Sequence, residues 1–358
     1  MKLRFSIIAA IAALAGIGAE TANAQAAQAP TVTVGGVGYL NYYYQLNLDS
    51  TMAPPAHGNN VDVARSYVNV LGKFSGGISS RVTVDVDGRK AAANQQTLRL
   101  KYAFVGWTPE GSHLTYKIGL IQTPWVDWEE SLWDYRMQGG IPMERAGYIT
   151  SSDFGAGVDG MWNYEQVNMQ VGIYNGEGYS NALGDNRKDV SGRVSVRLAR
   201  TDLPGKVGGL RLTGYANLGL ANGGGVRNRA IALLSYKSKM LTLAAEYGMM
   251  RDSTSVKTPD VQGSLVAAYG VFNVPKTKAA IIGRVDSFDP NIDSTATTAG
   301  ARIGANRQTR VIAGVSYAMT PNLRVLIDAD LNAIDGGSPS NSFDKGRQVV
   351  YFHTEFKF

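Results

Sequence analysis

Residues that could carry out catalysis are scattered along this sequence. The three histidines, His57, His113 and His353, lie far apart and give no metal-ligand spacing. No nucleophile elbow or Ser/His/Asp arrangement accompanies them. The stretch 155–160 matches G-x-G-x-x-G, but it leads into a strand-like run and not into a helix, so it predicts no nucleotide site. Because 85–88 also lacks the further ligands of a calcium loop, we expect no catalytic residue, metal or cofactor.

Basic side chains, by contrast, follow a regular spacing. They occupy every second position of strand-like segments, as Arg99 and Lys101 do between the apolar residues of 97–107. If such strands cross a membrane, a charge facing lipid at the midplane costs about 2–4 kcal/mol, so these side chains should face an aqueous interior. Alternatively, each pairs with an aspartate on a solvated wall. The inward-facing bases would be Arg65, Lys73, Arg81, Arg99, Lys101, Lys117, Arg193, Arg197, Arg211, Arg227, Arg229, Lys237, Arg284, Arg310, Arg324 and Lys357.

An acidic, Trp-rich segment at 123–150 interrupts this spacing. It holds three tryptophans, five acids and two bases, which gives a net charge of −3. Three tryptophans would be unusual on a loop surrounded by water, so we expect the segment to pack against another part of the chain. A loop that folds inward would narrow the interior; an external amphipathic helix or a lid is the alternative. The residues expected at this constriction are Trp125, Asp127, Glu129, Glu130, Asp134 and Arg136.

The elements that would position these residues are strands with alternating apolar and polar residues. About 16 such stretches occur, with short turns alternating with longer polar connections. This arrangement predicts an all-β fold, a transmembrane antiparallel β-barrel of 16 strands; 14 or 18 strands are alternatives. A soluble antiparallel sheet also alternates, but it would not need so many strands. The stretches lie near 31–46, 61–75, 78–88, 97–107, 112–122, 154–165, 167–175, 188–200, 208–221, 226–237, 239–251, 261–273, 277–287, 307–319, 322–333 and 346–358.

Composition and the first residues are consistent with this fold. The chain has 42 glycines, 18 tyrosines and no cysteine, and beyond its N-terminal segment no stretch reaches 18 apolar residues, which excludes transmembrane helices. Lys2, Arg4, the apolar run 5–17 and the small residues of 22–24 predict a signal peptide over 1–24. A membrane anchor is the alternative, but a run of about 13 apolar residues is too short to span a bilayer. The barrel would then occupy 25–358.

The last residues carry a more specific signal. Phe358 ends the chain, and Phe356, Phe352 and Val350 continue the same face of the last strand. This pattern resembles the sorting signal that the barrel-assembly machinery of the bacterial outer membrane reads. We therefore expect that machinery, the lipid bilayer and lipopolysaccharide as partners, and no nucleic acid.

Several short segments resemble the phosphate-selective porin O and P family. They are Ile118-Gly119-Leu120-Ile121-Gln122-Thr123-Pro124, Gly172-Ile173-Tyr174-Asn175-Gly176-Glu177-Gly178, Gly283-Arg284-Val285-Asp286-Ser287-Phe288-Asp289-Pro290, and Tyr317-Ala318-Met319-Thr320-Pro321-Asn322 with Arg324. Gln122 stands where that family commonly has lysine. The resemblance implies a 16-stranded, homotrimeric porin whose third external loop, after the fifth strand, folds into the lumen.

These observations together predict a porin for the passive diffusion of small hydrophilic and ionic solutes. The 16 inward-facing bases exceed eight inward-facing acids, so the pore should lean toward anions, and the acidic loop should weaken that preference. Alternatives are an anion- or phosphate-specific channel, an enzyme built on an outer-membrane barrel, and a structural or adhesive barrel with a plugged lumen. The eight acids are Asp85, Asp87, Asp159, Glu246, Asp286, Asp328, Asp330 and Glu355.

Overall fold

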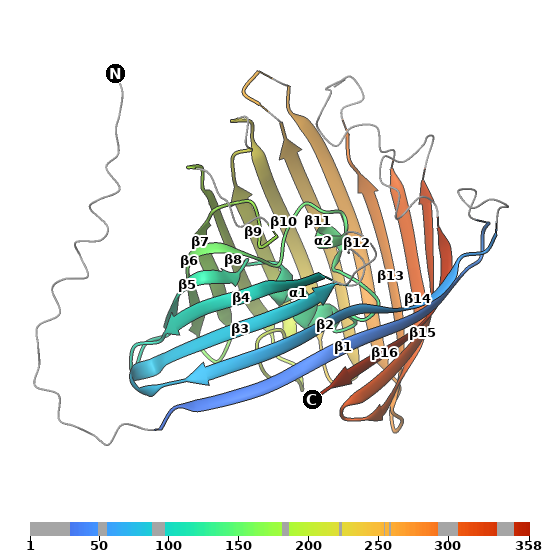
Figure 1. The fold of residues 1–358 in the computed structure, drawn as a ribbon, viewed down its shortest axis with the longest axis horizontal. Coiled ribbons are helices and arrows are strands. Elements are labelled where there is room, and N and C mark those ends of the chain that lie inside the picture. Colours follow the sequence, from blue (N-terminus) through green and yellow to red (C-terminus); the bar gives the residue numbers. More distant parts are fainter. Residues whose placement is uncertain are drawn as a thin grey trace, which may run out of the picture.

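Sixteen antiparallel strands form one closed barrel in the computed structural model (Figure 1). The structure describes residues 29–48, 56–87, 97–180, 186–221, 224–253, 255–257, 259–292, 307–334 and 347–358. Each strand pairs with its neighbours in the chain, and β1 pairs with β16 to close the ring. The predicted fold class and strand number are thereby confirmed. The predicted signal peptide, 1–24, lies outside the described residues.

The strands follow the predicted stretches closely. A short 3-10 turn, η3 (Ser75–Gly77), joins β2 to β3. The strands are β1 (Thr31–Gln45), β2 (Asn59–Lys73), β3 (Ile78–Asp87), β4 (Thr97–Trp107), β5 (Leu114–Gln122), β6 (Ser152–Trp162), β7 (Val167–Tyr174), β8 (Asp189–Ala199), β9 (Gly209–Leu218), β10 (Arg227–Lys237), β11 (Leu241–Asp252), β12 (Val261–Asn273), β13 (Ala279–Asp289), β14 (Gln308–Thr320), β15 (Leu323–Ile334) and β16 (Gln348–Lys357).

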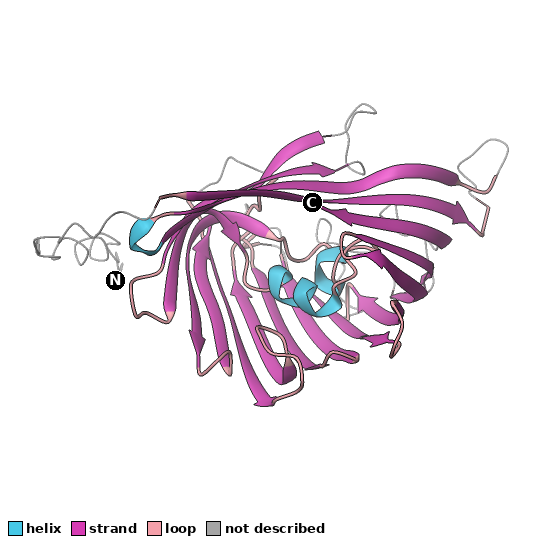
Figure 2. Cartoon of the chain, turned by 90° about the horizontal axis from the view of Figure 1, so that it is seen from below, coloured by secondary structure: helices cyan, strands magenta, loops and turns pink. Residues whose placement is uncertain are grey.

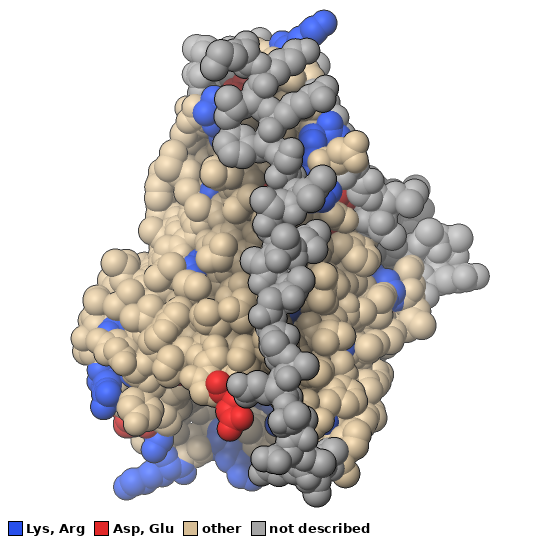
Figure 3. Space-filling model, turned by 90° about the vertical axis from the view of Figure 1, so that its left-hand side faces the viewer, with Lys and Arg blue, Asp and Glu red and all other residues tan. Residues whose placement is uncertain are grey.

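Alternation along each strand places polar residues inside the barrel and apolar residues outside. On β8, Ser191 and Arg193 are buried, whereas the intervening Val190 and Val194 are exposed. Such a pattern is the reverse of a soluble sheet and fits strands that stand between water and lipid. On the face drawn in Figure 3, uncharged residues cover the middle, and lysines and arginines gather toward the two ends.

The two chain-end strands meet through glycines. Gly36 and Phe358 exchange two backbone hydrogen bonds, Gly36 N to Phe358 O at 2.9 Å and Phe358 N to Gly36 O at 3.1 Å. A Cβ on Gly36 or on Gly38 would lie 2.3 Å from the ring of Phe358 or Phe356, respectively. Only glycine leaves room for these rings, so the aromatic C-terminus packs directly on the β1 backbone.

Two helices lie inside the ring, α1 (Val126–Trp133) and α2 (Pro142–Arg145) (Figure 2). Both belong to the connection between β5 and β6. The main hydrophobic core is therefore inside the barrel, where Trp125, Trp133 and Met137 pack on wall residues such as Leu233 and Leu265. None of the helices formed by the described residues has the length and apolar character to cross a membrane.

Candidate functional site

Helix α1 is short and depends on its surroundings. Asp127 and Glu129 lie in its first turn, where acidic side chains favour the helix dipole. It ends at Asp134, which adopts a left-handed conformation with φ 44°. From β10, Lys237 Nζ donates to the backbone oxygens of Ser131 at 2.6 Å and Leu132 at 3.2 Å. Since eight residues are too few for a stable isolated helix, these wall contacts hold its last turn in place.

The tryptophans of the segment face the wall and not the passage. Trp125, Trp128 and Trp133 are all at most 1% exposed. Trp133 packs edge-on against Tyr269 of β12, with ring centroids 5.3 Å apart, and the guanidinium of Arg193 lies 4.0 Å from the Trp128 ring centroid. The structure thus places segment 123–150 inside the barrel, packed against one side of it.

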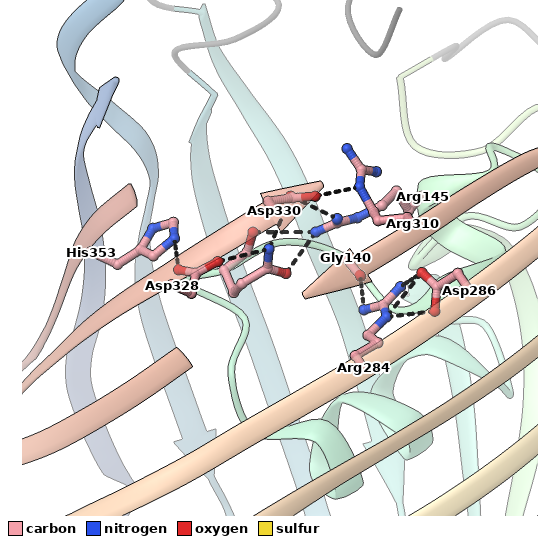
Figure 4. A network of polar contacts seen from close by, with 9 residues as sticks. Gly140, Arg145, Arg284, Asp286, Arg310, Asp328, Asp330 and His353 are labelled. Carbon is pink, nitrogen blue, oxygen red and sulfur yellow. Dashed lines mark hydrogen bonds and ion pairs between the residues drawn. The ribbon is translucent and has the colours of Figure 1, made fainter. Parts of the chain in front are cut away.

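Arginines of that side donate to the backbone of the segment. Arg193 Nε bonds Pro124 O at 2.8 Å, and Arg229 Nε bonds Tyr148 O at 2.9 Å. Arg284 Nη1 bonds Gly140 O at 2.8 Å, and its other nitrogens bind Asp286 on the same strand (Figure 4). Buried carbonyl groups need such donors, because water cannot reach them there.

A second set of polar contacts fixes the tip of the segment to β15, whose acids also bind residues of β14 and β16. Gln138 Nε2 donates to Asp330 Oδ2 at 3.1 Å, and Arg145 Nη1 lies 3.4 Å from the same oxygen. Arg310 Nε bonds the other oxygen at 2.7 Å, so one carboxylate joins loop and wall (Figure 4). Beside it, Asp328 Oδ1 lies 2.8 Å from His353 Nε2.

A buried pair of carboxyl groups lies between α1 and β11. Glu129 faces Glu246, and both side chains are almost fully buried. Trp125 Nε1 donates to Glu129 Oε2 at 2.7 Å, whereas the remaining three carboxyl oxygens have no hydrogen-bond partner among the described residues. Burial raises the pKa of Glu129. Two such carboxyls can share one proton, which would act as the hydrogen bond between them.

The expectation that all the inward-facing bases line open water must be corrected for five of them. Arg193, Arg211, Arg229 and Arg284, and Lys101 on the opposite wall, are each at most 6% exposed. The loop covers the four arginines, because its backbone and tryptophans pack onto the wall that carries them, whereas tyrosines of the wall bury Lys101. Trp125 and Glu129 face the wall of the four arginines, so they stabilise the loop and do not border the passage.

Two further predicted bases of the covered side lie near opposite rims of the barrel, Arg227 at the start of β10 and Arg197 near the end of β8. Arg227 pairs with Asp189 at 3.0 Å beside a cavity of about 400 Å³ behind the return limb 147–150. Arg197 donates to the backbone oxygen of Tyr164 at 2.6 Å. Arg227 thus has its partner on the wall, and Arg197 has its partner in the turn between β6 and β7.

The opposite wall, built by β2–β5, remains uncovered by the loop. Arg81 lies over the Tyr102 ring at 4.3 Å, and Lys101 lies over Tyr67 at 4.5 Å and donates to its hydroxyl at 3.3 Å. Three further predicted bases near this wall pair with acids. Arg65 and Arg99 share Asp85, and Lys117 pairs with Asp159 of β6. Lys73, at the end of β2, is exposed.

A cavity of about 210 Å³ separates this wall from the loop. Arg81 and Lys101 line it on the wall side, and Asp127, Glu130 and Asp134 line it on the loop side. Charges of opposite sign thus face each other across the lumen. Within the loop, Arg136 Nε lies 2.7 Å from Glu130 and its Nη2 lies 3.2 Å from Glu144. This arginine partly neutralises the negative charge on the loop side of the cavity. Arg324, from β15, pairs with Asp134 at 3.3 Å.

Sequence reasoning missed several residues of this site. Lys206 belongs to a turn, outside the alternation used to choose inward-facing residues, yet its Nζ lies 2.6 Å from Asp127 Oδ2. Gln138 looked like an ordinary polar loop residue. The unusual length of the turn 200–208 was the available signal for Lys206. Among the described residues, no group of His, Asp or Glu side chains is suited to hold a metal ion.

Comparison with known proteins shows which solved structures share this architecture. No protein-family model matches the chain, and no curated protein matches it. Among solved structures, outer-membrane expressed OmpT of Vibrio cholerae has a TM-score of 0.61 at 11% identity, over 92% of this chain and 98% of that one. A triple mutant of Rhodopseudomonas blastica porin has a TM-score of 0.53 at 12% identity, over 92% and 100%. The fold is that of a bacterial outer-membrane porin. The narrower resemblance to the phosphate-selective O and P family stays a prediction.

Proposed function

We propose that this chain is an outer-membrane porin through which small hydrophilic solutes diffuse passively. The observation that carries this proposal is a barrel with an apolar exterior whose polar lumen holds an anchored loop opposite an uncovered wall of bases. A barrel of this kind places a water path across a bilayer, and the loop reduces its width.

The distribution of charge supports a weak preference for anions. Five bases of the uncovered wall contact its tyrosines or pair with acids, and together with Asp85 and with Asp159 of β6 they carry a net charge of +3. The cavity side of the loop carries four acids and one base, a net charge of −3. Lys206 and Arg324, which lie outside this balance and pair with Asp127 and Asp134, shift the net charge toward positive, whereas Lys357 is balanced by Glu355 at 2.9 Å. Because mobile ions screen such fields over about 8 Å at physiological salt, the expected chloride-over-potassium preference is only a few-fold. The wall set is Arg65, Arg81, Arg99, Lys101, Lys117, Asp85 and Asp159, and the loop set is Asp127, Glu130, Asp134, Glu144 and Arg136.

A phosphate-specific channel is the alternative within the same class. It would need several donors free to converge on one anion, and Arg65, Arg99 and Lys117 are already held by Asp85 and Asp159. Because these three bases are already paired with acids, the arrangement favours general diffusion over a specific phosphate site.

We also propose that the barrel is not an enzyme. The imidazole of His353 is fully buried, with Asn41 Oδ1 2.7 Å from Nδ1 and Asp328 Oδ1 2.8 Å from Nε2. A general base must reach substrate, and both nitrogens of this ring face partners in the wall. The arrangement therefore supports a structural role for His353.

We propose that the protein lies in the outer membrane, in contact with lipid and lipopolysaccharide. We also propose that the barrel-assembly machinery recognises Phe358 and that the protein forms a homotrimer. The exposed apolar side chains of the strands support the lipid location. A related solved structure, the in-vitro folded OmpT of Vibrio cholerae, is described as a trimer form, at 12% identity and a TM-score of 0.57. Chemical cross-linking of the detergent-purified protein would test the trimer.

Single-channel recording in planar bilayers tests the function. The purified protein should give uniform conductance steps in KCl and a reversal potential that indicates a few-fold preference for chloride. Absence of conductance from a folded, heat-modifiable protein would contradict the porin proposal. A clear cation preference would contradict the anion preference, and block by micromolar phosphate would favour the phosphate-specific alternative.

A further inference from the structure

The turn 200–208, between β8 and β9, is built into the interior of the barrel. Thr201 Oγ1 donates to the backbone oxygen of Lys237 at 2.6 Å, and Asp202 Oδ1 accepts the backbone N–H of Lys239 at 3.0 Å. Val207 joins the hydrophobic core, and Arg211 Nε bonds Gly208 O at 3.1 Å. These contacts fix the turn at both ends and present its middle to the lumen.

The middle of the turn contacts the constriction loop. Lys206 Nζ lies 2.6 Å from Asp127 Oδ2 and 5.7 Å from the ring centroid of Trp128. Asp127 is in the first turn of α1 and lines the 210 Å³ cavity together with Arg81 and Lys101. The Lys206 and Asp127 side chains are 36% and 41% exposed, so the pair also faces water.

From this geometry we infer that Lys206 is a specificity-determining residue of the constriction, although it belongs to a turn at the opposite rim from the long loops. It cancels the charge of Asp127 at the cavity and so keeps the acidic side of the loop from dominating ion selection. The inference rests on the proposed diffusion function. It adds a residue that neither the strand alternation nor the loop itself supplies.

The groups around Asp127 determine what removal of Lys206 would do. Burial raises the pKa of Asp127, but the ion pair with Lys206 outweighs it, and the pKa falls to about 2. Arg81 of β3 and Lys117 of β5 act in the same direction from across the lumen, and Glu130 lies nearby on the same helix. Without Lys206, the carboxylate should titrate at a higher pH and carry an uncompensated charge at neutral pH.

The test compares Lys206→Met with Lys239→Met, which removes the same charge from an exposed neighbouring turn that does not contact the loop. At neutral pH, Lys206→Met should shift the chloride-to-potassium permeability ratio toward potassium by about twofold or more. Asp127→Asn should shift it toward chloride, and the double variant should return near the wild-type ratio. Lys239→Met should leave the ratio unchanged.

The pH dependence of the ratio provides an independent readout. In both proteins the ratio should rise toward chloride at acid pH as Glu130 is protonated, because burial raises the pKa of Glu130, but in wild type Asp127 stays ionised and paired down to about pH 3. In Lys206→Met the ratio should rise further, because the unpaired Asp127 is also protonated in the acid range, so the two curves should converge at low pH. If wild type conducts and Lys206→Met matches Lys239→Met in both measurements, the inference is wrong. If wild type does not conduct, the proposed function itself fails.

Discussion

The two halves of the lumen wall carry the same residue types at the same alternation and use them differently. On β8–β13, Arg193, Arg229 and Arg284 donate to carbonyl groups of the loop and are buried by it. On β3 and β4, Arg81 and Lys101 lie on tyrosine rings and border the cavity. An inward-facing base that the loop covers is therefore part of the packing beneath it. An inward-facing base that the loop leaves uncovered borders the passage.

This difference changes how pore selectivity is read from composition. A basic residue beneath the loop contributes to the fold and is remote from passing ions, so counting all inward-facing bases overstates the positive field. The bases opposite the loop act on solutes, but several are paired with acids. Selectivity should therefore follow a small set of uncovered and unbalanced charges.

Removing the loop tests the comparison most strongly. Deletion of residues 127–136 removes α1 and should raise single-channel conductance severalfold while the barrel remains heat-modifiable. It should also uncover Arg193 and Arg211, which lie against the ring of Trp128, so the preference for chloride should increase. Planar-bilayer recording in a KCl gradient measures both quantities. Unchanged conductance would mean that the loop does not limit the passage.

Matched substitutions on the two walls should separate stability from selectivity. Arg284→Met leaves Asp286 and the carbonyl of Gly140 without their buried partner, which should cost roughly 3–5 kcal/mol of unfolding free energy and loosen the loop. Arg81→Met removes a partly exposed base and should change stability little, while lowering the chloride preference.

Denaturant unfolding in detergent should show the larger stability loss in Arg284→Met. Reversal potentials should show the larger loss of chloride preference in Arg81→Met. Equal losses of stability in both variants would contradict the distinction between a covered and an uncovered wall.

The sequence was enough to predict the barrel, because alternation has a direct physical cause: each strand stands between water and lipid. Residues 123–150 were also identifiable, since tryptophans and acids interrupt that alternation. The partners of the loop were not identifiable. Glu246 meets Glu129, and Lys206 meets Asp127, only because the closed barrel brings distant strands and turns around one loop. Alternation says which way a side chain points but not what covers it.

The carboxyl pair beneath α1 gives the smallest expected effect, a pH dependence of loop stability. Burial raises the pKa of Glu129 above the ordinary value of about 4.3, so the folded state holds a proton that the unfolded state releases. The stabilisation is fully present below that ordinary value and is lost as the pH rises through the folded-state pKa. Glu246 and Tyr269 from the wall face the same carboxyl, and Arg284 lies close by.

Glu129→Gln should flatten this dependence, because an amide donates a hydrogen bond to Glu246 at every pH. Asp134→Asn, which removes an exposed acid of the same loop, should leave the wild-type slope in place. Unfolding midpoints and open-channel current noise between pH 5 and pH 9 measure the effect. Wild type should become less stable and noisier toward alkaline pH, and Glu129→Gln should not. The same slope in both proteins would show that no shared proton joins α1 to β11.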